Sequence, residues 1–68
     1  MNEDVVNMEI RKFLKKVGIT SQREIEKALQ KAAADGKLDG GGPFQATMTL
    51  EIAGLGLVHT IKGELAVE

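Results

Sequence analysis

The stretch from Phe44 to Val67 constrains the fold more than any other part of the chain. Apolar and polar residues alternate from Ala46 to Ile52, which is the pattern of a strand with one apolar face and one polar face. A second alternation runs from Leu57 to Val67 and is interrupted at Gly63. Two such runs around a short glycine-containing segment predict an antiparallel β-hairpin over residues 44–67.

The segment between the two runs, residues 53–56, determines the predicted register. Gly54 and Leu55 suit the central positions of a type II′ turn, whose first position needs positive φ. A loop centred on Leu55-Gly56 would shift every pairing by two residues and keep the same face inward. The preferred turn pairs Ile52 with Leu57, Leu50 with His59, Met48 with Ile61, Ala46 with Gly63 and Phe44 with Leu65 on the apolar face, and Thr49 with Thr60 and Thr47 with Lys62 on the polar face.

A two-stranded hairpin is only marginally stable alone, so we expect helices to cover its apolar face. Residues 4–17 predict the first helix, which Asn2 or Asp4 caps and which Gly18 ends. Its apolar residues recur at helical spacing and form one stripe: Val6, Ile10, Phe13, Leu14 and Val17.

Residues 21–35 predict the second helix. Ser21 to Glu24 has the S-x-x-E form of a capping box, and Gly36 supplies a left-handed stop. Residues 39–43 are a glycine-rich loop that lacks the lysine and the strand-before-helix setting of a P-loop, so we interpret it as a flexible connector. The predicted fold is α+β, a two-layer helix-helix-strand-strand arrangement in one domain over residues 1–68, with the hairpin covered by both helices. We expect Leu50 and Ile61 to lie in its core.

Composition narrows the class of protein. The 68 residues are near the lower limit for a single apolar core, and the absence of cysteine excludes disulfides and thiolate metal sites. A net charge of −1 and a pI near 5.8 argue mildly against a dedicated nucleic-acid binder. No signal peptide or membrane span is recognisable, so we expect a soluble cytoplasmic protein that does not bind membranes.

No residue pattern indicates catalysis. His59 is the only histidine, and a lone histidine without cysteine or clustered carboxylates is a poor metal ligand. It could act as a pH switch or in acid–base chemistry, but the plainer interpretation is a packed ring at the sheet margin. Thr20 and Ser21 have no base placed in sequence to activate them, and capping explains Ser21. We therefore expect no catalytic residue, no metal, no cofactor and no enzymatic activity.

Binding is the role left by this exclusion. Each edge of a two-stranded sheet exposes unpaired backbone groups, so we expect a homodimer through the hairpin edge or an interaction with another protein. The Ala-rich second helix is another candidate contact surface, because its small side chains would let it approach another element closely. The last candidate surface is basic, although its plainer interpretation is a solvated outer helix face. Its residues are Arg11, Lys12, Lys15, Arg23, Lys27 and Lys31.

An alternative interpretation is a winged-helix-like DNA-binding protein. A turn at residues 18–20 between two helices, followed by a hairpin, resembles the second half of such a domain, with helix 21–35 as the recognition helix. Gln22, Arg23, Lys27 and Gln30 would then face the major groove. Winged-helix cores normally contain three helices, only two are predicted here, and the chain has no basic excess, so nucleic acid is the less favoured partner.

Several segments together resemble an uncharacterised family of small bacterial proteins of unknown function. They are residues 1–4, 10–18, 20–26, 36–38, 48–50 and 54–57, including the run Ile10-Arg11-Lys12-Phe13-Leu14 and the run Gly54-Leu55-Gly56-Leu57. The resemblance spans nearly the whole chain and is most specific in the first half. It implies a free-standing, soluble bacterial protein of two helices and a hairpin. The resemblance carries over no functional residue.

Overall fold

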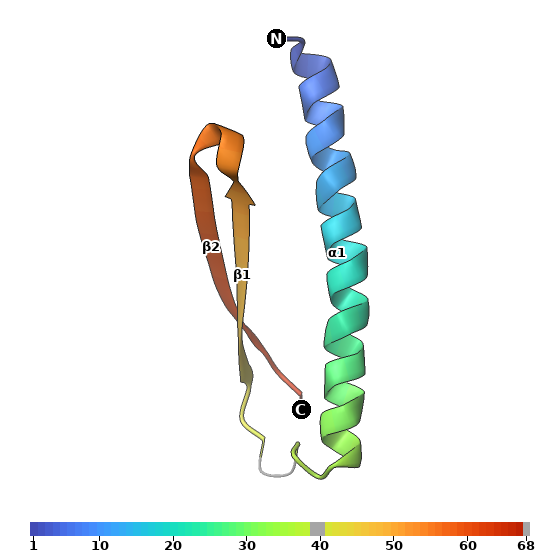
Figure 1. The fold of residues 1–68 in the computed structure, drawn as a ribbon. Coiled ribbons are helices and arrows are strands. Elements are labelled where there is room, and N and C mark those ends of the chain that lie inside the picture. Colours follow the sequence, from blue (N-terminus) through green and yellow to red (C-terminus); the bar gives the residue numbers. More distant parts are fainter. Residues whose placement is uncertain (39–40, 68) are drawn as a thin grey trace. The chain divides into compact units, whose positions relative to one another are not determined.

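The computed structural model describes residues 1–38 and 41–67, which form one long helix followed by a hairpin (Figure 1). Helix α1 spans Glu3–Ala34, strand β1 spans Phe44–Ile52, the short 3-10 helix η1 spans Ala53–Leu55, and strand β2 spans Leu57–Leu65. The α+β class is confirmed. The chain divides into two compact units, residues 1–36 and 37–68, which are described separately below. The single domain predicted over residues 1–68 stays a prediction.

The prediction of two helices, 4–17 and 21–35, is wrong. Helix α1 continues through Gly18, Ile19 and Thr20, where the sequence predicts a turn (Figure 1). A glycine inside a helix costs only about 1 kcal/mol relative to alanine, which the cooperative hydrogen bonding of a long helix offsets. No proline lies within α1, so no residue removes a backbone donor from it.

The capping box at Ser21 is also wrong, because Ser21 is a half-buried residue inside α1. The hydroxyl of the neighbouring Thr20 donates a hydrogen bond to the Lys16 carbonyl oxygen, 2.8 Å away, as threonines within helices commonly do. A serine followed three residues later by glutamate fits a helix interior as well as a helix start. The pattern alone therefore does not establish a break.

Both ends of α1 agree with the prediction. The Oδ1 atom of Asn2 accepts hydrogen bonds from the backbone N–H groups of Asp4, at 3.1 Å, and Val5, at 3.2 Å. At the other end Gly36 has φ 72°, and its N–H donates to the Ala33 carbonyl oxygen, 3.1 Å away. Only the internal break is wrong.

The continuous helix places the apolar stripe predicted before Gly18 and apolar residues after Gly18 on one face. Val6, Val17 and Ala28 are spaced eleven residues apart, which is just over three helical turns at about 3.6 residues per turn. The stripe that begins before Gly18 therefore continues after it. The half-buried residues of α1 are Val6, Val17, Ser21, Leu29 and Ala32.

The hairpin has the predicted register, pair for pair. Strands β1 and β2 are antiparallel, with Phe44 opposite Leu65 at the open end and Ile52 opposite Leu57 next to the turn. Apolar and polar residues alternate along both strands, and this register places the residues of the apolar face opposite one another. The remaining predicted pairs, Leu50 with His59, Met48 with Ile61, Ala46 with Gly63, Thr49 with Thr60 and Thr47 with Lys62, are all confirmed.

The turn that connects these strands differs from the predicted type II′ turn. Residues 53–56 form a four-residue connection in which Gly56, not Gly54, has positive φ, at 61°. The Gly56 N–H donates to the Ala53 carbonyl oxygen at 3.1 Å. Four-residue loops of this kind contain a type I turn and end in a left-handed residue, so the final glycine carries the conformational requirement.

Burial is the main departure from the predicted core. None of the residues that the structure describes is buried. Leu50 is half-buried, Ile61 is 55% exposed, and His59 is exposed rather than packed. The expectation of a buried Ile61 is therefore wrong. The chain has only two phenylalanines and neither tryptophan nor tyrosine, so it contains few of the large aromatic side chains that contribute most to a core.

Only residues 41–43 of the predicted glycine-rich loop are described, because Asp39 and Gly40 lie outside the described residues. Glu68 at the end of the chain also lies outside them. The Gly41 N–H donates to the Leu38 carbonyl oxygen at 3.1 Å. A Cβ atom at Gly41 would lie 2.6 Å from the same oxygen, closer than real Cβ contacts allow. Glycine is therefore required at position 41 by this close backbone approach.

Candidate interaction surfaces

The first candidate surface is the pair of hairpin edges. Within residues 1–38 and 41–67 the only sheet has the order β1-β2, so each strand is paired on one side. The other side of each strand presents N–H and C=O groups that a further strand could pair. Such an edge is a template for strand addition, either by another protein or by a second copy of the chain.

The hairpin's apolar face adjoins these edges and is accessible. Met48 is 41% exposed and Ile61 is 55% exposed, and these two residues lie opposite each other. Small residues, Ala46 and Gly63, form the next pair on this face. A Cβ atom built at Gly63 meets nothing within 4 Å. The face therefore has both the room and the apolar side chains that a partner could cover.

The polar face of β2 carries two opposite charges on either side of Gly63. Lys62 is opposite Thr47, and Glu64 is opposite Gln45. The Nε2 atom of Gln45 donates a hydrogen bond to Glu64 Oε1 at 3.1 Å, which holds the carboxylate on this face. Sequence reasoning missed the relation between these two charges, although their alternation with Gly63 was visible.

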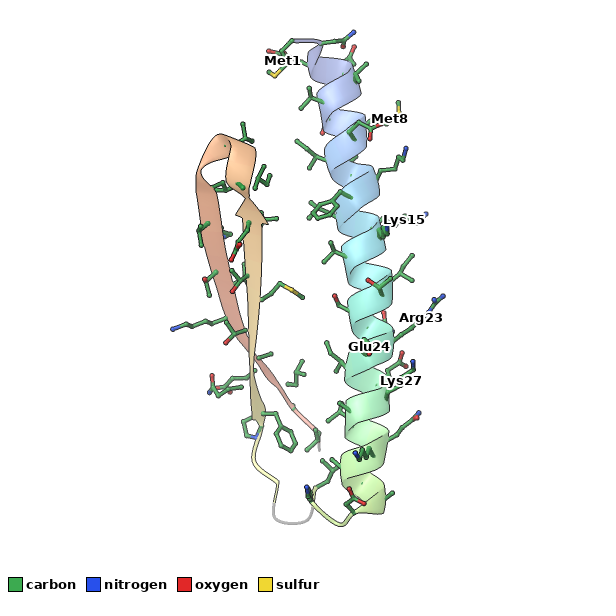
Figure 2. All side chains as sticks on the ribbon, in the orientation of Figure 1. Met1, Met8, Lys15, Arg23, Glu24 and Lys27 are labelled. Carbon is green, nitrogen blue, oxygen red and sulfur yellow. The ribbon has the colours of Figure 1, made fainter. Side chains whose placement is uncertain are left out.

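The six predicted basic residues all lie on α1. Arg23, Lys27 and Lys31 follow one another at four-residue spacing, and Arg11 and Lys15 have the same spacing, so each set forms a row on the helix. Figure 2 shows Lys15, Arg23 and Lys27 extending from the same side of α1 in that view. Lys12 contacts Glu9 at 3.7 Å and Lys27 contacts Glu24 at 3.4 Å, in exposed pairs one helical turn apart.

These ion pairs argue against the basic residues of α1 as a binding site for an anion. Each exposed pair contributes only a few tenths of a kcal/mol, but it places a carboxylate beside the lysine that would meet an anion. The acidic residues of the first turn, Glu3 and Asp4, and the basic Lys31 of the last turn complement the helix dipole. The plainer interpretation, a solvated outer face, accounts for these positions.

Two other candidate sites carry less chemistry. An open hollow near the start of β1 is lined by Gly41, Gly42, Pro43, Glu64, Ala66 and Val67. Its single charged group is the Glu64 carboxylate, which already accepts a hydrogen bond from Gln45. Across the described part of the chain, no three histidine, cysteine, aspartate or glutamate side chains gather as a metal site.

The helix-turn-helix geometry is not present. Residues 18–20, the predicted turn, are helical, so residues 21–35 do not form a separate recognition helix. Gln22, Arg23, Lys27 and Gln30 lie on the second half of α1. The winged-helix interpretation required two helices crossing at a turn, and residues 1–38 and 41–67 contain a single α-helix.

Fold and surfaces together define a class: a small α+β chain with one long amphipathic helix and a hairpin with open edges. None of the helical segments that the structure describes combines the length and hydropathy that a bilayer crossing requires. The chain belongs to a family of unknown function, DUF6494, whose model matches residues 1–68. The predicted resemblance is thereby confirmed. No curated protein and no solved structure matched the chain.

Proposed function

We propose that this chain is a non-catalytic interaction module whose partner is a second copy of itself. The observation that carries the proposal is the two-stranded hairpin, each strand of which is paired on one side only within the described residues. Small sheets gain stability when further strands join them, and small chains gain apolar burial when they associate. Cytoplasmic location and bacterial origin stay predictions.

The exposed apolar residues support the same proposal. In the hairpin, Ile61 and Met48 are exposed, and in α1, Phe13 and Leu14 are about half exposed, at 51% and 53%. Full burial of a large apolar side chain stabilises a structure by about 1.5–3 kcal/mol relative to full exposure, so each of these half-exposed side chains can contribute about half of that on association. A second copy would supply an equal set of such residues.

The test is the molecular mass of the chain as a function of concentration. Sedimentation equilibrium from about 1 μM to about 1 mM, the range in which weak to moderate dimers dissociate, should show a rise from the 7.3 kDa monomer towards twice that mass. A chain that keeps the monomer mass across this range would refute self-association. Strand addition by a different protein would then be the next hypothesis.

A further inference from the structure

We propose that two copies pair through their β2 edges, antiparallel, with the two-fold axis at Gly63. This inference rests on the proposed self-association and names the residues that carry it. The β2 strands would form the centre of a four-stranded sheet, and each β1 strand would lie at an outer edge. An antiparallel pairing of identical strands is closed and two-fold symmetric, as most homodimers are.

Charge complementarity selects this register. With Gly63 on the axis, Lys62 of each copy faces Glu64 of the other, which gives two opposite-charge pairs. An axis at Lys62 would place two lysines opposite each other, and an axis at Glu64 would place two glutamates opposite each other. Moving the axis by one residue in either direction therefore brings two like charges together. The register with the axis at Gly63 instead forms two pairs of opposite charge.

The apolar face fits the same axis. Ile61 of each copy faces Leu65 of the other, and both side chains lie on the face that carries Met48. Gly63 of one copy would lie opposite Gly63 of the other at the axis. A Cβ atom added at this position has no neighbouring atom within 4 Å in the single chain. Ala66 and Val67, which follow β2, would lengthen the paired region on both sides. Opposite charges and matched apolar residues thus coincide in one register.

The β1 edge lacks this complementarity. Glu51 is the only charged residue of β1, so a pairing of two β1 strands forms no opposite-charge pair in any register. Pairing β1 of one copy with β2 of the next is heterologous and leaves an edge open for a further copy, which builds fibres rather than dimers. The β2 edge is therefore the one that the charges favour.

Cysteine cross-linking tests the axis directly, because the natural chain has no cysteine. Opposed residues in antiparallel strands have Cα atoms about 4.5–5.5 Å apart, which is within the range of a disulfide. We expect Gly63→Cys to give a covalent dimer under mild oxidation. The matched controls are Ala46→Cys, directly opposite on β1, and Ile61→Cys, two residues away on β2. Both should stay monomeric on non-reducing gels.

Charge reversal is the second test. Lys62→Glu and Glu64→Lys each replace two attractive pairs with two repulsive pairs, so each should raise the dimer Kd about tenfold. The double variant Lys62→Glu/Glu64→Lys exchanges the charges and should return the Kd to within about threefold of the natural chain. Glu64→Lys also loses the hydrogen bond from Gln45. Lys62→Glu does not, which makes it the cleaner single variant.

The outcomes separate the two proposals. Cross-linking at Ala46 or Ile61 in place of Gly63, or a double variant no tighter than the single ones, would overturn the β2 register and leave self-association standing. A natural chain that remains at 7.3 kDa throughout would overturn both. A Gly63 cross-link together with rescue by the double variant establishes the register.

Discussion

Gly18 and Gly56 occupy opposite kinds of backbone, although both follow an apolar residue and precede another in the sequence. Gly18 is inside α1, where any residue fits, and a built Cβ meets nothing within 4 Å. Gly56 has φ 61° in the hairpin turn, where a side chain is strained whatever the space. Substitution by alanine should therefore change stability in opposite directions at the two positions.

Gly18→Ala should raise the free energy of unfolding of α1 by about 0.5–1 kcal/mol, because alanine restricts the unfolded chain and costs nothing in the helix. The measurement is the helical circular dichroism signal as a function of temperature. A lower helical signal in the variant would indicate that the chain needs glycine for a break at this position, as the two-helix prediction requires.

Gly56→Ala should lower the free energy of unfolding of the hairpin by about 1–2 kcal/mol, since alanine is disfavoured in the left-handed region. Cross-strand nuclear Overhauser effects between β1 and β2 report on the hairpin itself. Gly54→Ala is the matched control, because Gly54 does not have positive φ and nothing lies within 4 Å of its Cβ position. Equal loss of hairpin signals in both variants would contradict the observed turn.

At the scale of elements, the continuity of α1 can be measured as a length. Met8 and Lys27 are both exposed and lie nineteen residues apart on either side of Gly18. At about 1.5 Å per residue, an uninterrupted helix separates their backbones by about 28 Å. Spin labels at cysteines introduced there should give a narrow distribution near this distance, after correction for the label tethers. A shorter or broad distribution would contradict a single helix.

The hairpin was predictable from sequence because apolar and polar residues alternate along both of its strands. Alternation along both strands allows registers that differ by two residues, and the position of the loop glycines selects between them. The turn type was not predictable, since Gly54 and Gly56 both support a connection that leaves Ile52 opposite Leu57. The register depends on the residues at which the loop is centred, and the position of the left-handed residue depends on how the loop bends.

The predicted break between two helices was wrong because the sequence signals on which it rested are ambiguous. Gly18 and the Ser21 to Glu24 pattern are each compatible with a boundary, but neither forbids a helix. Only in-phase apolar stripes distinguish the cases, and Val17 and Ala28 are in phase. Of the candidate surfaces, the basic residues could be placed on helices from sequence. The alternation of Lys62, Gly63 and Glu64 was also visible in the sequence, and the observed strand bounds place all three on β2, which is paired on one side among the described residues.

At the scale of the whole molecule, a side chain that is exposed in the single chain can be changed to test association without disturbing the fold. Ile61 is 55% exposed in the single chain, so Ile61→Thr should leave the circular dichroism spectrum of the monomer unchanged. In the proposed dimer the same change removes apolar contact with Leu65 twice and should raise the dimer Kd about tenfold. Sedimentation equilibrium measures the second effect. Unfolding of the variant at low concentration would instead restore Ile61 to a core role.

The absence of a buried residue among those described has a consequence for how the chain responds to dilution. A protein that stays monomeric unfolds at a temperature that does not depend on its concentration. Here apolar side chains that are only half-buried in the single chain lose further contact with water in the proposed dimer, so stability and association become linked by mass action. Dilution of the proposed dimer lowers its apparent unfolding temperature towards that of the folded monomer, so two samples that differ only in concentration differ in stability.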